Sequence, residues 1–281
     1  MPPHVLLLGG HGKVALHLTP LLLARSWNVT SVIRNPEHEK EILQLGSGHG
    51  LQGKGKGKGK VEVLVSSLDD VKSDADAQAI LDKVQPDYVV WSAGAGGKGG
   101  PERTYAIDQN AAKHFIATAL ASPRVKKFLL ISHLGSRRNK PAWMTDDDWR
   151  HLQHVNHDLL PTYAKAKLEA DEYLTARAEL RRRQFPDSPF QYILLRPGWL
   201  SDERATGRVA LGKTGAQGKV TREDVAIVAD RLLARDDTHG WYDLLNGDEP
   251  IDEAVERVVR EGVDAVEGED VEGMIKRFNL Q

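Results

Sequence analysis

The chain has 281 residues, of which 40% are hydrophobic and 28% are charged, and it contains no cysteine. This length suits one large α/β domain or two small ones, and the ordinary globular composition argues against disorder throughout. The lack of cysteine excludes a disulfide scaffold, a cysteine-ligated zinc or iron–sulfur site and a thiol nucleophile. The formal net charge of -2 provides no overall field that would attract nucleic acid or an anionic membrane.

The first residues, MPPHVLLLGG, lack both the basic start and the long apolar run of a signal peptide. No stretch of the sequence reaches the roughly 18 apolar residues that a membrane-spanning helix needs. We therefore expect a cytoplasmic protein, monomeric or homodimeric, that acts on a small molecule and binds neither a membrane nor a nucleic acid.

Six short apolar runs, each followed by turn or polar residues, predict strands at residues 5–8, 29–33, 61–65, 88–91, 128–131 and 192–195. The runs lack an alternation of apolar and polar residues, which is typical of strands buried on both faces. Segments long enough for helices lie between them, at residues 14–23, 37–45, 74–84, 109–121 and 163–183. Repeated β-α-β units with right-handed crossovers predict the α/β class, with a Rossmann-type doubly wound parallel sheet.

The last third of the chain has a different pattern. Residues 221–224, Thr-Arg-Glu-Asp, resemble a capping box that opens a helix over residues 222–233. Residues 241–245 predict a short late strand, and residues 251–259 predict a further helix. We interpret this part as a small C-terminal substrate lobe over the strand ends, within a single domain of residues 1–281.

A low-complexity segment of alternating glycine and lysine occupies residues 53–60. Such a segment buries no apolar area and has high chain entropy, so we predict a mobile spacer loop. It precedes the third strand, whereas ligands of such sheets bind beyond the carboxyl ends of the strands. This position argues against a phosphate-binding or nucleic-acid-binding patch.

A glycine-rich turn follows the first predicted strand and opens a helix. Gly9, Gly12 and Ala15 fall at positions i, i+3 and i+6. The first permits a tight turn, the second lets the backbone approach a pyrophosphate, and the third packs the helix against the strand. The helix N-terminus presents unpaired N–H groups and the positive end of its dipole to the phosphates. The residues predicted to bind a dinucleotide here are Gly9, Gly10, His11, Gly12, Lys13 and Val14.

The residue after the second strand indicates which dinucleotide is bound. An NAD site has Asp or Glu there, to hydrogen-bond the ribose 2′-hydroxyl, whereas this chain has Arg34 and no carboxylate before Glu37. A guanidinium suits a 2′-phosphate through charge-assisted hydrogen bonds. We therefore predict NADP(H) in preference to NAD(H), with Lys13 assisting, although an arginine can also simply cap a strand end.

Two further strand ends are expected beside the cofactor. Ser67 and Leu68 follow the third strand, where an adenine ring would be flanked. Ser92, Ala93 and Gly94 follow the fourth strand and are small enough for the cofactor to lie against the backbone.

Tyr163 and Lys167 lie four residues apart, on one face of a predicted helix. An ammonium close to a phenol favours the phenolate, so we expect a lowered pKa for Tyr163 and a role as general acid or base. Lys167 could also hold the ribose hydroxyls beside the nicotinamide. Such a pair alone usually marks a solvated helix face, but here it follows a dinucleotide fingerprint.

These motifs together resemble those of the atypical short-chain dehydrogenase/reductases, within the NAD(P)-binding group that includes NmrA-like and biliverdin-reductase-B-like proteins. The resemblance spans residues 5–254. It is carried by Gly-Gly-His-Gly-Lys at 9–13, Val-Ile-Arg-Asn at 32–35, Phe-Leu-Leu-Ile-Ser at 128–132, the stretch 163–171, Leu-Arg-Pro-Gly at 195–198 and Arg-Glu-Asp-Val-Ala at 222–226.

The resemblance implies a Rossmann domain, NAD(P)H and a catalytic trio of Ser132, Tyr163 and Lys167. Ser132 would orient the substrate oxygen, and Pro197 and Gly198 would lie against the nicotinamide. The segments expected on the substrate side are residues 134–162 and 199–220, approximately.

The sequence leaves three alternatives open. Either Ser132 or Ser136 could face the site. His151, His154 and His157 are spaced three apart and could share a metal, but we favour a solvated or substrate-lining helix and predict no metal site.

The leading hypothesis is an NADP(H)-dependent oxidoreductase, with hydride transfer to or from a small carbonyl or alcohol. An epimerase- or dehydratase-like enzyme and a dinucleotide-sensing regulator without turnover are the alternatives.

Overall fold

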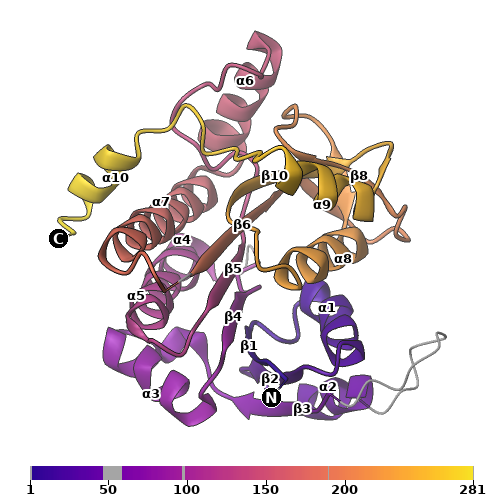
Figure 1. Ribbon diagram of the computed structural model, residues 1–281, viewed down its shortest axis with the longest axis vertical. Coiled ribbons are helices and arrows are strands. Elements are labelled where there is room, and N and C mark those ends of the chain that lie inside the picture. Colours follow the sequence, from indigo (N-terminus) through magenta and orange to yellow (C-terminus); the bar gives the residue numbers. More distant parts are fainter. Residues whose placement is uncertain (1, 47–58, 97–98, 189, 281) are drawn as a thin grey trace.

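A sheet of nine strands runs through the middle of the molecule, with helices on both of its faces (Figure 1). The computed structural model describes residues 2–46, 59–96, 99–188 and 190–280. The strand order is β11-β8-β10-β6-β5-β4-β1-β2-β3. These strands are β1 (His4–Leu8), β2 (Asn28–Ile33), β3 (Val61–Val65), β4 (Tyr88–Trp91), β5 (Lys127–Ile131), β6 (Gln191–Pro197), β8 (Arg208–Gly212), β10 (Gly240–Asn246) and β11 (Glu249–Pro250).

The pairings among β1 to β6 and β10 are all parallel, whereas β8, near one edge, pairs antiparallel with both β10 and β11. The strand order reverses between β1 and β4, as in a Rossmann-type doubly wound sheet. The predicted fold class is therefore confirmed. All six predicted strands are present, and their observed ends lie within two residues of the predicted ones.

Two sets of helices cover the two faces of the sheet (Figure 1). One face carries α1 (Lys13–Ala24), α8 (Arg222–Leu233) and α9 (Ile251–Arg260), and the other carries α3 (Asp74–Val84), α5 (Ala112–Ala121) and α7 (Pro161–Gln184). In β1, Val5 and Leu7 pack in the first layer, whereas Leu6 and Leu8 pack in the second. All four side chains are fully buried, which explains why this strand shows no apolar–polar alternation.

The shorter helical elements lie at the ends of the strands and beyond the sheet. They are 3₁₀ turns η1 (Pro36–His38) and η2 (Leu68–Asp70), α2 (Glu39–Gly46), α4 (Gly100–Thr104), π-helical turns η3 (Tyr105–Ala111) and η4 (Val155–Leu159), α6 (Asp146–His154) and α10 (Val271–Arg277). The helix predicted to begin at residue 109 thus begins at Gly100 and includes a π-helical turn. Such turns are common at functional sites, and apolar periodicity does not reveal them.

The C-terminal strands form a smaller lobe. The predicted late strand is β10, which pairs with β6 and so also extends the main sheet. A separate two-stranded sheet joins β7 (Trp199–Ser201) to β9 (Lys219–Thr221). The predicted cap of α8 is confirmed, because Thr221 Oγ1 accepts a 2.9 Å hydrogen bond from the Asp224 N–H.

The glycine–lysine segment predicted to be a spacer loop lies outside the described residues except at Gly59 and Lys60. Lys60 leads into β3, and its N–H donates to Asn28 Oδ1 at 3.1 Å. The Val29 N–H in turn donates to the Lys60 carbonyl oxygen at 2.8 Å. The end of the segment is thereby joined to the beginning of β2.

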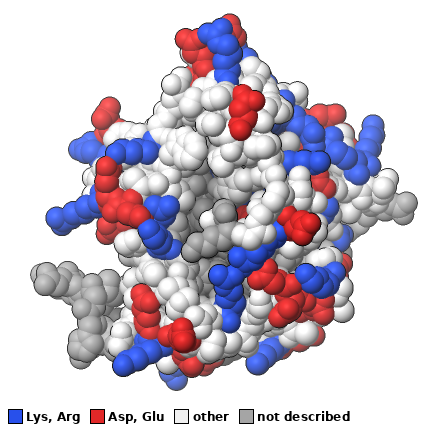
Figure 2. Space-filling model, turned by 180° about the vertical axis from the view of Figure 1, so that it is seen from behind, with Lys and Arg blue, Asp and Glu red and all other residues white. Residues whose placement is uncertain are grey.

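Two observations concern the described helices and one face of the surface. None of the described helices is long and apolar enough to cross a membrane. On the face shown in Figure 2, acidic and basic side chains are interspersed, without a large patch of one sign. This distribution agrees with the formal net charge of -2.

Candidate active site

Two adjoining cavities lie beyond the carboxyl ends of the parallel strands. The first has a volume of about 230 Å³ and is bordered by the glycine turn and the ends of β2, β3 and β4. The second, of about 390 Å³, is bordered by the ends of β5 and β6 and by α6, η4 and α7. Ala95, which follows β4 in the chain, lines both cavities, so the two cavities meet beyond the carboxyl end of β4. Ligands of doubly wound sheets bind in this position.

The glycine turn has the geometry expected for a pyrophosphate site. Gly9 has φ of +82°, and a Cβ there would lie 2.6 Å from the Cα of Ala93. Gly12 is the N-cap of α1, and no side chain caps the first turn of that helix. The N–H groups of this turn are therefore open to an anion. Gly9 and Gly12 both line the first cavity.

The other residues predicted around the phosphates have different surroundings. The Gly10 N–H donates to the Val32 carbonyl at 2.9 Å, and a Cβ on Gly10 would lie 1.7 Å from Ser31 Oγ, so Gly10 is needed for packing on β2. Val14 is buried in the core. Lys13 is exposed and forms an ion pair with Asp202.

His11 does line the first cavity. Its ring stacks on that of His38, with 3.5 Å between ring centroids, and its Nε2 lies 2.7 Å from Glu41 Oε2. The histidine pair therefore closes the side of the cavity where the glycine turn meets η1.

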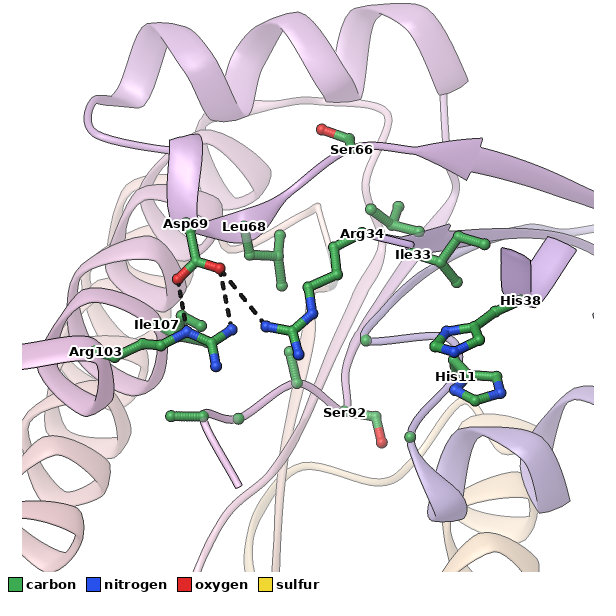
Figure 3. Close-up of a pocket in the computed structure, with 16 residues that line it drawn as sticks. His11, Ile33, Arg34, His38, Ser66, Leu68, Asp69, Ser92, Arg103 and Ile107 are labelled. Atoms are coloured by element: carbon green, nitrogen blue, oxygen red, sulfur yellow. Dashed lines mark hydrogen bonds and ion pairs between the residues drawn. The ribbon is translucent and has the colours of Figure 1, made fainter. Parts of the chain in front are cut away.

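Two arginines and one carboxylate lie at the end of the first cavity beyond β2 and β3 (Figure 3). Arg103 donates two hydrogen bonds to Asp69, at 2.9 and 3.0 Å, and these bonds lower the pKa of Asp69. Arg34 Nη1 is 3.9 Å from Asp69 Oδ2, and 57% of its side chain is exposed. The two guanidiniums and the carboxylate together carry a net charge of +1. Arg34 makes the weaker contact with Asp69, because it is farther from the carboxylate and more exposed than Arg103.

The two strand ends predicted to flank the cofactor contribute unequally. Leu68, Ser92, Ala93 and Gly94 line the first cavity. Ser67 does not line it, and its hydroxyl caps η2 by accepting a 3.2 Å hydrogen bond from the Asp69 N–H. Asp69 and Arg103 lie 34 residues apart and meet only in the fold, so no local sequence pattern pointed to them.

The predicted catalytic trio converges beside the second cavity. Ser132, at the end of β5, and Tyr163, in the first turn of α7, both line it. Lys167 is buried behind them, with Nζ 5.7 Å from the centre of the Tyr163 ring. Pro197 and Gly198 line the same cavity. The structure therefore brings together the five residues predicted for the reacting end.

Lys167 is held by groups from two other elements. Its Nζ donates to the Ile131 carbonyl at 3.2 Å and lies 3.3 Å from Asp108 Oδ1. Asp108 comes from η3 and also accepts the Ala95 N–H at 2.9 Å. Burial opposes protonation of Lys167, but Tyr163 and Asp108 outweigh it and raise the pKa of the lysine. Lys167 is therefore an ammonium at neutral pH.

The expected lowering of the Tyr163 pKa is wrong. Burial raises the pKa of Tyr163, and the nearby carboxylates of Asp108 and Asp171 raise it further, which outweighs the opposite effect of Lys167. The sequence showed the lysine four residues away, but not the carboxylates that the fold brings to it. Tyr163 is thus a phenol, able to donate a proton, at neutral pH.

Of the two candidate serines, Ser132 lines the second cavity, whereas Ser136 does not. Ser132 Oγ donates to Asp171 and lies 2.6 Å from both carboxylate oxygens. Burial raises the pKa of Asp171 to about 6, while Arg196 and the two serines act in the opposite direction.

A neutral histidine also faces the second cavity. His133 lies 5.5 Å from Tyr163 between ring centroids, and its Nε2 is 3.4 Å from Asn156 Oδ1. Burial lowers the pKa of His133 to about 4, so the ring is uncharged at neutral pH. His133 directly follows Ser132 in the sequence, and nothing in its spacing assigned it to the site.

The loop after β5 is supported by a buried charge cluster. Arg196 Nη2 donates to the Leu134 carbonyl at 2.8 Å, and its Nε lies 3.3 Å from Asp243 Oδ1. Arg137 Nη2 lies 3.3 Å from the other oxygen of Asp243. All three side chains are fully buried, so each charge depends on the others for compensation.

The three spaced histidines have separate partners. His154 Nδ1 is 2.7 Å from Asp158, His157 Nε2 is 2.8 Å from Gln153, and His151 lines the second cavity. In the part of the chain that the structure describes, no group of three or more His, Cys, Asp or Glu side chains could hold a metal ion.

A family model for NAD(P)H-binding proteins matches residues 9–236. The chain belongs to this NAD(P)H-binding family. The matched segment includes the glycine turn, the ends of the strands that border the two cavities, and Ser132, Tyr163 and Lys167. It supports the resemblance to atypical short-chain dehydrogenase/reductases.

Individual proteins agree with this assignment. A UPF0659 protein of Schizosaccharomyces pombe is 32% identical over 90% of this chain and 94% of its own length. An uncharacterised sugar epimerase of Bacillus subtilis is 32% identical over 61% of this chain and 69% of its own. A solved structure from Bacillus halodurans, described as an NAD-dependent epimerase/dehydratase, is 27% identical with a TM-score of 0.67, covering 91% of this chain and 99% of its own.

Proposed function

We propose that this NAD(P)H-binding protein is an NADP(H)-dependent oxidoreductase that interconverts a small carbonyl compound and its alcohol. The supporting observation is that Ser132, Tyr163 and the buried Lys167 meet at the second cavity, directly beside the cavity formed by the glycine turn. Tyrosine and lysine in this arrangement can transfer a proton at a substrate oxygen.

The residues fit a bound dinucleotide. A Cβ on Gly9 would occupy the space against Ala93, and the uncapped N–H groups in the first turn of α1, which follows Gly12, suit a pyrophosphate. Bound NADPH would supply a hydride, with its electron pair, to the carbonyl carbon. The phenol of Tyr163 donates its proton to the carbonyl oxygen and regains one from solvent. The ammonium of Lys167 lies close enough to stabilise the phenolate that forms.

The preference for NADP(H) is supported by the charge at the end of the first cavity. Arg103 is engaged by two hydrogen bonds to Asp69, whereas Arg34 is half-exposed and 3.9 Å away from the same carboxylate. Arg34 can therefore turn toward a 2′-phosphate at little cost. A phosphate monoester would meet a net positive charge there.

The deciding experiment compares wild type with Tyr163→Phe, using NADPH oxidation across a panel of carbonyl compounds. We expect turnover by wild type and a loss of 100-fold or more in kcat, roughly, for the variant. NADPH binding, followed by fluorescence, should remain within about twofold. A wild type that binds NADPH but reduces nothing, or a variant as active as wild type, would contradict the proposal.

Epimerase- or dehydratase-like chemistry is the second candidate, because two of the similar proteins are described in those terms. Such a reaction returns the hydride to the substrate and consumes no NADPH. Product formation without a change in NADPH absorbance would therefore favour it. A regulator that only senses the dinucleotide would bind NADPH with no product at all. We also propose, from the sequence, a cytoplasmic location and a monomeric or homodimeric state.

A further inference from the structure

The walls of the second cavity are mainly apolar. Its apolar side chains come from the loop after β5, from α6 and η4, from β7 and from the loop before β9, and they include Leu134, Leu152, Val155, Leu160 and Ala216. Leu134, Leu152, Val155 and Ala216 are buried even in the free protein. The body of a molecule in this cavity would therefore contact hydrocarbon on several sides.

The polar groups at the inner end of this cavity already have protein partners. Ser132 donates to Asp171, Asp108 pairs with Lys167 and the Ala95 N–H, and His133 contacts Asn156. These groups can receive one reacting oxygen, with Tyr163 as donor, but they leave few hydrogen bonds for further hydroxyl groups. A buried polar group without a partner is unfavourable, so a sugar would lose more hydrogen bonds to water than it gained.

Among the described residues of the cavity wall, the remaining polar side chains are Thr104, His151 and Arg222. Arg222 donates to Asp202 at 2.6 Å, and Thr104 donates to the Gly100 carbonyl. Beside Arg222, Trp199 and Leu200 of β7 line the cavity with 50% and 36% of their surfaces exposed. Two large exposed apolar side chains at the mouth of a cavity mark a surface that a ligand covers.

We propose that the second cavity binds a bulky, mainly apolar carbonyl compound, with its reacting oxygen at Tyr163 and its body over Trp199 and Leu200. This inference rests on the proposed function and gives it a substrate class, which differs from a sugar or sugar nucleotide. Reduction forms one C–H and one O–H bond. The hydride comes from NADPH, which becomes NADP⁺, and the proton comes from solvent through Tyr163.

The test measures binding first, because binding does not depend on turnover. Full-length protein saturated with NADP⁺ is titrated with 1-acetonaphthone, an apolar aromatic ketone, and separately with UDP-glucose. Calorimetry and quenching of tryptophan fluorescence report the two affinities. We expect acetonaphthone to bind with both signals and UDP-glucose to give no heat at the same concentrations. Binding of UDP-glucose alone, or of neither compound, would overturn the proposal.

Three variants locate the bound ligand. Trp199→Ser and Leu200→Ser should each raise the Kd for acetonaphthone by about tenfold or more, since each removes a large apolar contact. The matched control is Leu43→Ser on α2, because Leu43 is 44% exposed and lies outside the second cavity. Equal Kd values for the Leu200 and Leu43 variants would place the ligand elsewhere and refute the inference.

A parallel assay with NADPH separates the two claims. If acetonaphthone binds as expected but neither it nor related apolar ketones are reduced, the oxidoreductase proposal fails and the binding class stands. If polyhydroxylated carbonyl compounds are reduced and apolar ones are not, the oxidoreductase proposal stands and the binding class fails.

Discussion

The Ser132 hydroxyl donates to the carboxylate of Asp171, with its oxygen 2.6 Å from each carboxylate oxygen. Both side chains are buried, and Asp171 follows Lys167 by one turn of α7. A serine hydroxyl has one hydrogen, so Ser132 presents only lone pairs to the second cavity while Asp171 is ionised. A protonated Asp171 can instead donate to Ser132 and release that hydrogen for the substrate oxygen.

This relationship predicts a pH dependence of carbonyl reduction. Since burial raises the pKa of Asp171 to about 6, the rate should decrease as pH rises through about 6. Asp171→Asn places a permanent amide donor against Ser132, and we expect it to abolish this decrease. The measurement is kcat/KM against pH for wild type and variant. Asp82→Asn, on the exposed side of α3, is the control and should keep the wild-type profile, whereas a decrease that persists in Asp171→Asn would contradict the assignment.

The same shift predicts a pH dependence of stability. Between pH 3.8 and about 6, native Asp171 retains a proton that the unfolded chain has released. The native state binds more protons in this range, so this residue destabilises the fold as pH rises, by about 3 kcal/mol in total. Urea unfolding at pH 4 and pH 7 should therefore show that wild type loses stability relative to Asp171→Asn. If the difference in unfolding free energy between the two proteins is the same at pH 4 and pH 7, the raised pKa of Asp171 is refuted.

Arg34→Asp should reverse the cofactor preference. The variant places a carboxylate where we expect the 2′-phosphate, so the Kd for NADPH should rise at least tenfold, roughly, while the Kd for NADH stays equal or falls. Fluorescence titration measures both constants. Arg182→Asp, on the exposed end of α7, changes the net charge equally and should leave both unchanged. Equal affinity of wild type for the two cofactors would rule out the role of Arg34.

Gly9→Ala should impair dinucleotide binding as well as stability. The substitution imposes a side chain at φ of +82° and places Cβ 2.6 Å from the Cα of Ala93. Gly262→Ala is the control, because Gly262 has φ of +61° but open space around its Cβ position. We expect a cost of about 1–2 kcal/mol from the left-handed backbone alone in the control. Urea unfolding and NADPH titration should show a larger loss of stability, and a loss of binding, only for Gly9→Ala.

Asp243→Asn should destabilise the protein by about 3–5 kcal/mol, because it leaves the buried guanidiniums of Arg196 and Arg137 without their shared counterion. The double variant Arg196→Met with Asp243→Asn should recover part of this loss. Chemical denaturation of both variants checks the prediction. A double variant that is less stable by the full sum of the two single losses would show that the two side chains act independently.

Much of the fold could be predicted from local patterns. The strands were recognisable because residues such as Val5 and Leu6 are buried on opposite faces, which produces continuous apolar runs. The glycine turn and the Tyr163–Lys167 pair are also local, since their spacing fixes their relative positions. These features determined the place of both cavities.

Contacts between distant segments could not be predicted in this way. Asp108 reaches Lys167 through a π-helical turn, and Asp69 meets Arg103 across 34 residues. The wrong expectation for the Tyr163 pKa has the same origin, because burial and two carboxylates from the fold outweigh one neighbouring lysine. The roles of Gly10, Lys13, Val14 and Ser67 likewise depend on the packing around each residue rather than on the motif.

The pairing of β6 with β10 has a consequence for where this protein can be divided. In the register of these two parallel strands, Asp243 lies directly opposite Arg196. The family match ends at residue 236, before β10 begins at Gly240. A chain shortened after residue 236 would keep every motif of the dinucleotide site but would leave the Arg196 and Arg137 guanidiniums without their shared counterion. The minimal unit able to hold the Leu134 loop in place therefore extends through β10, beyond the segment by which the family is recognised.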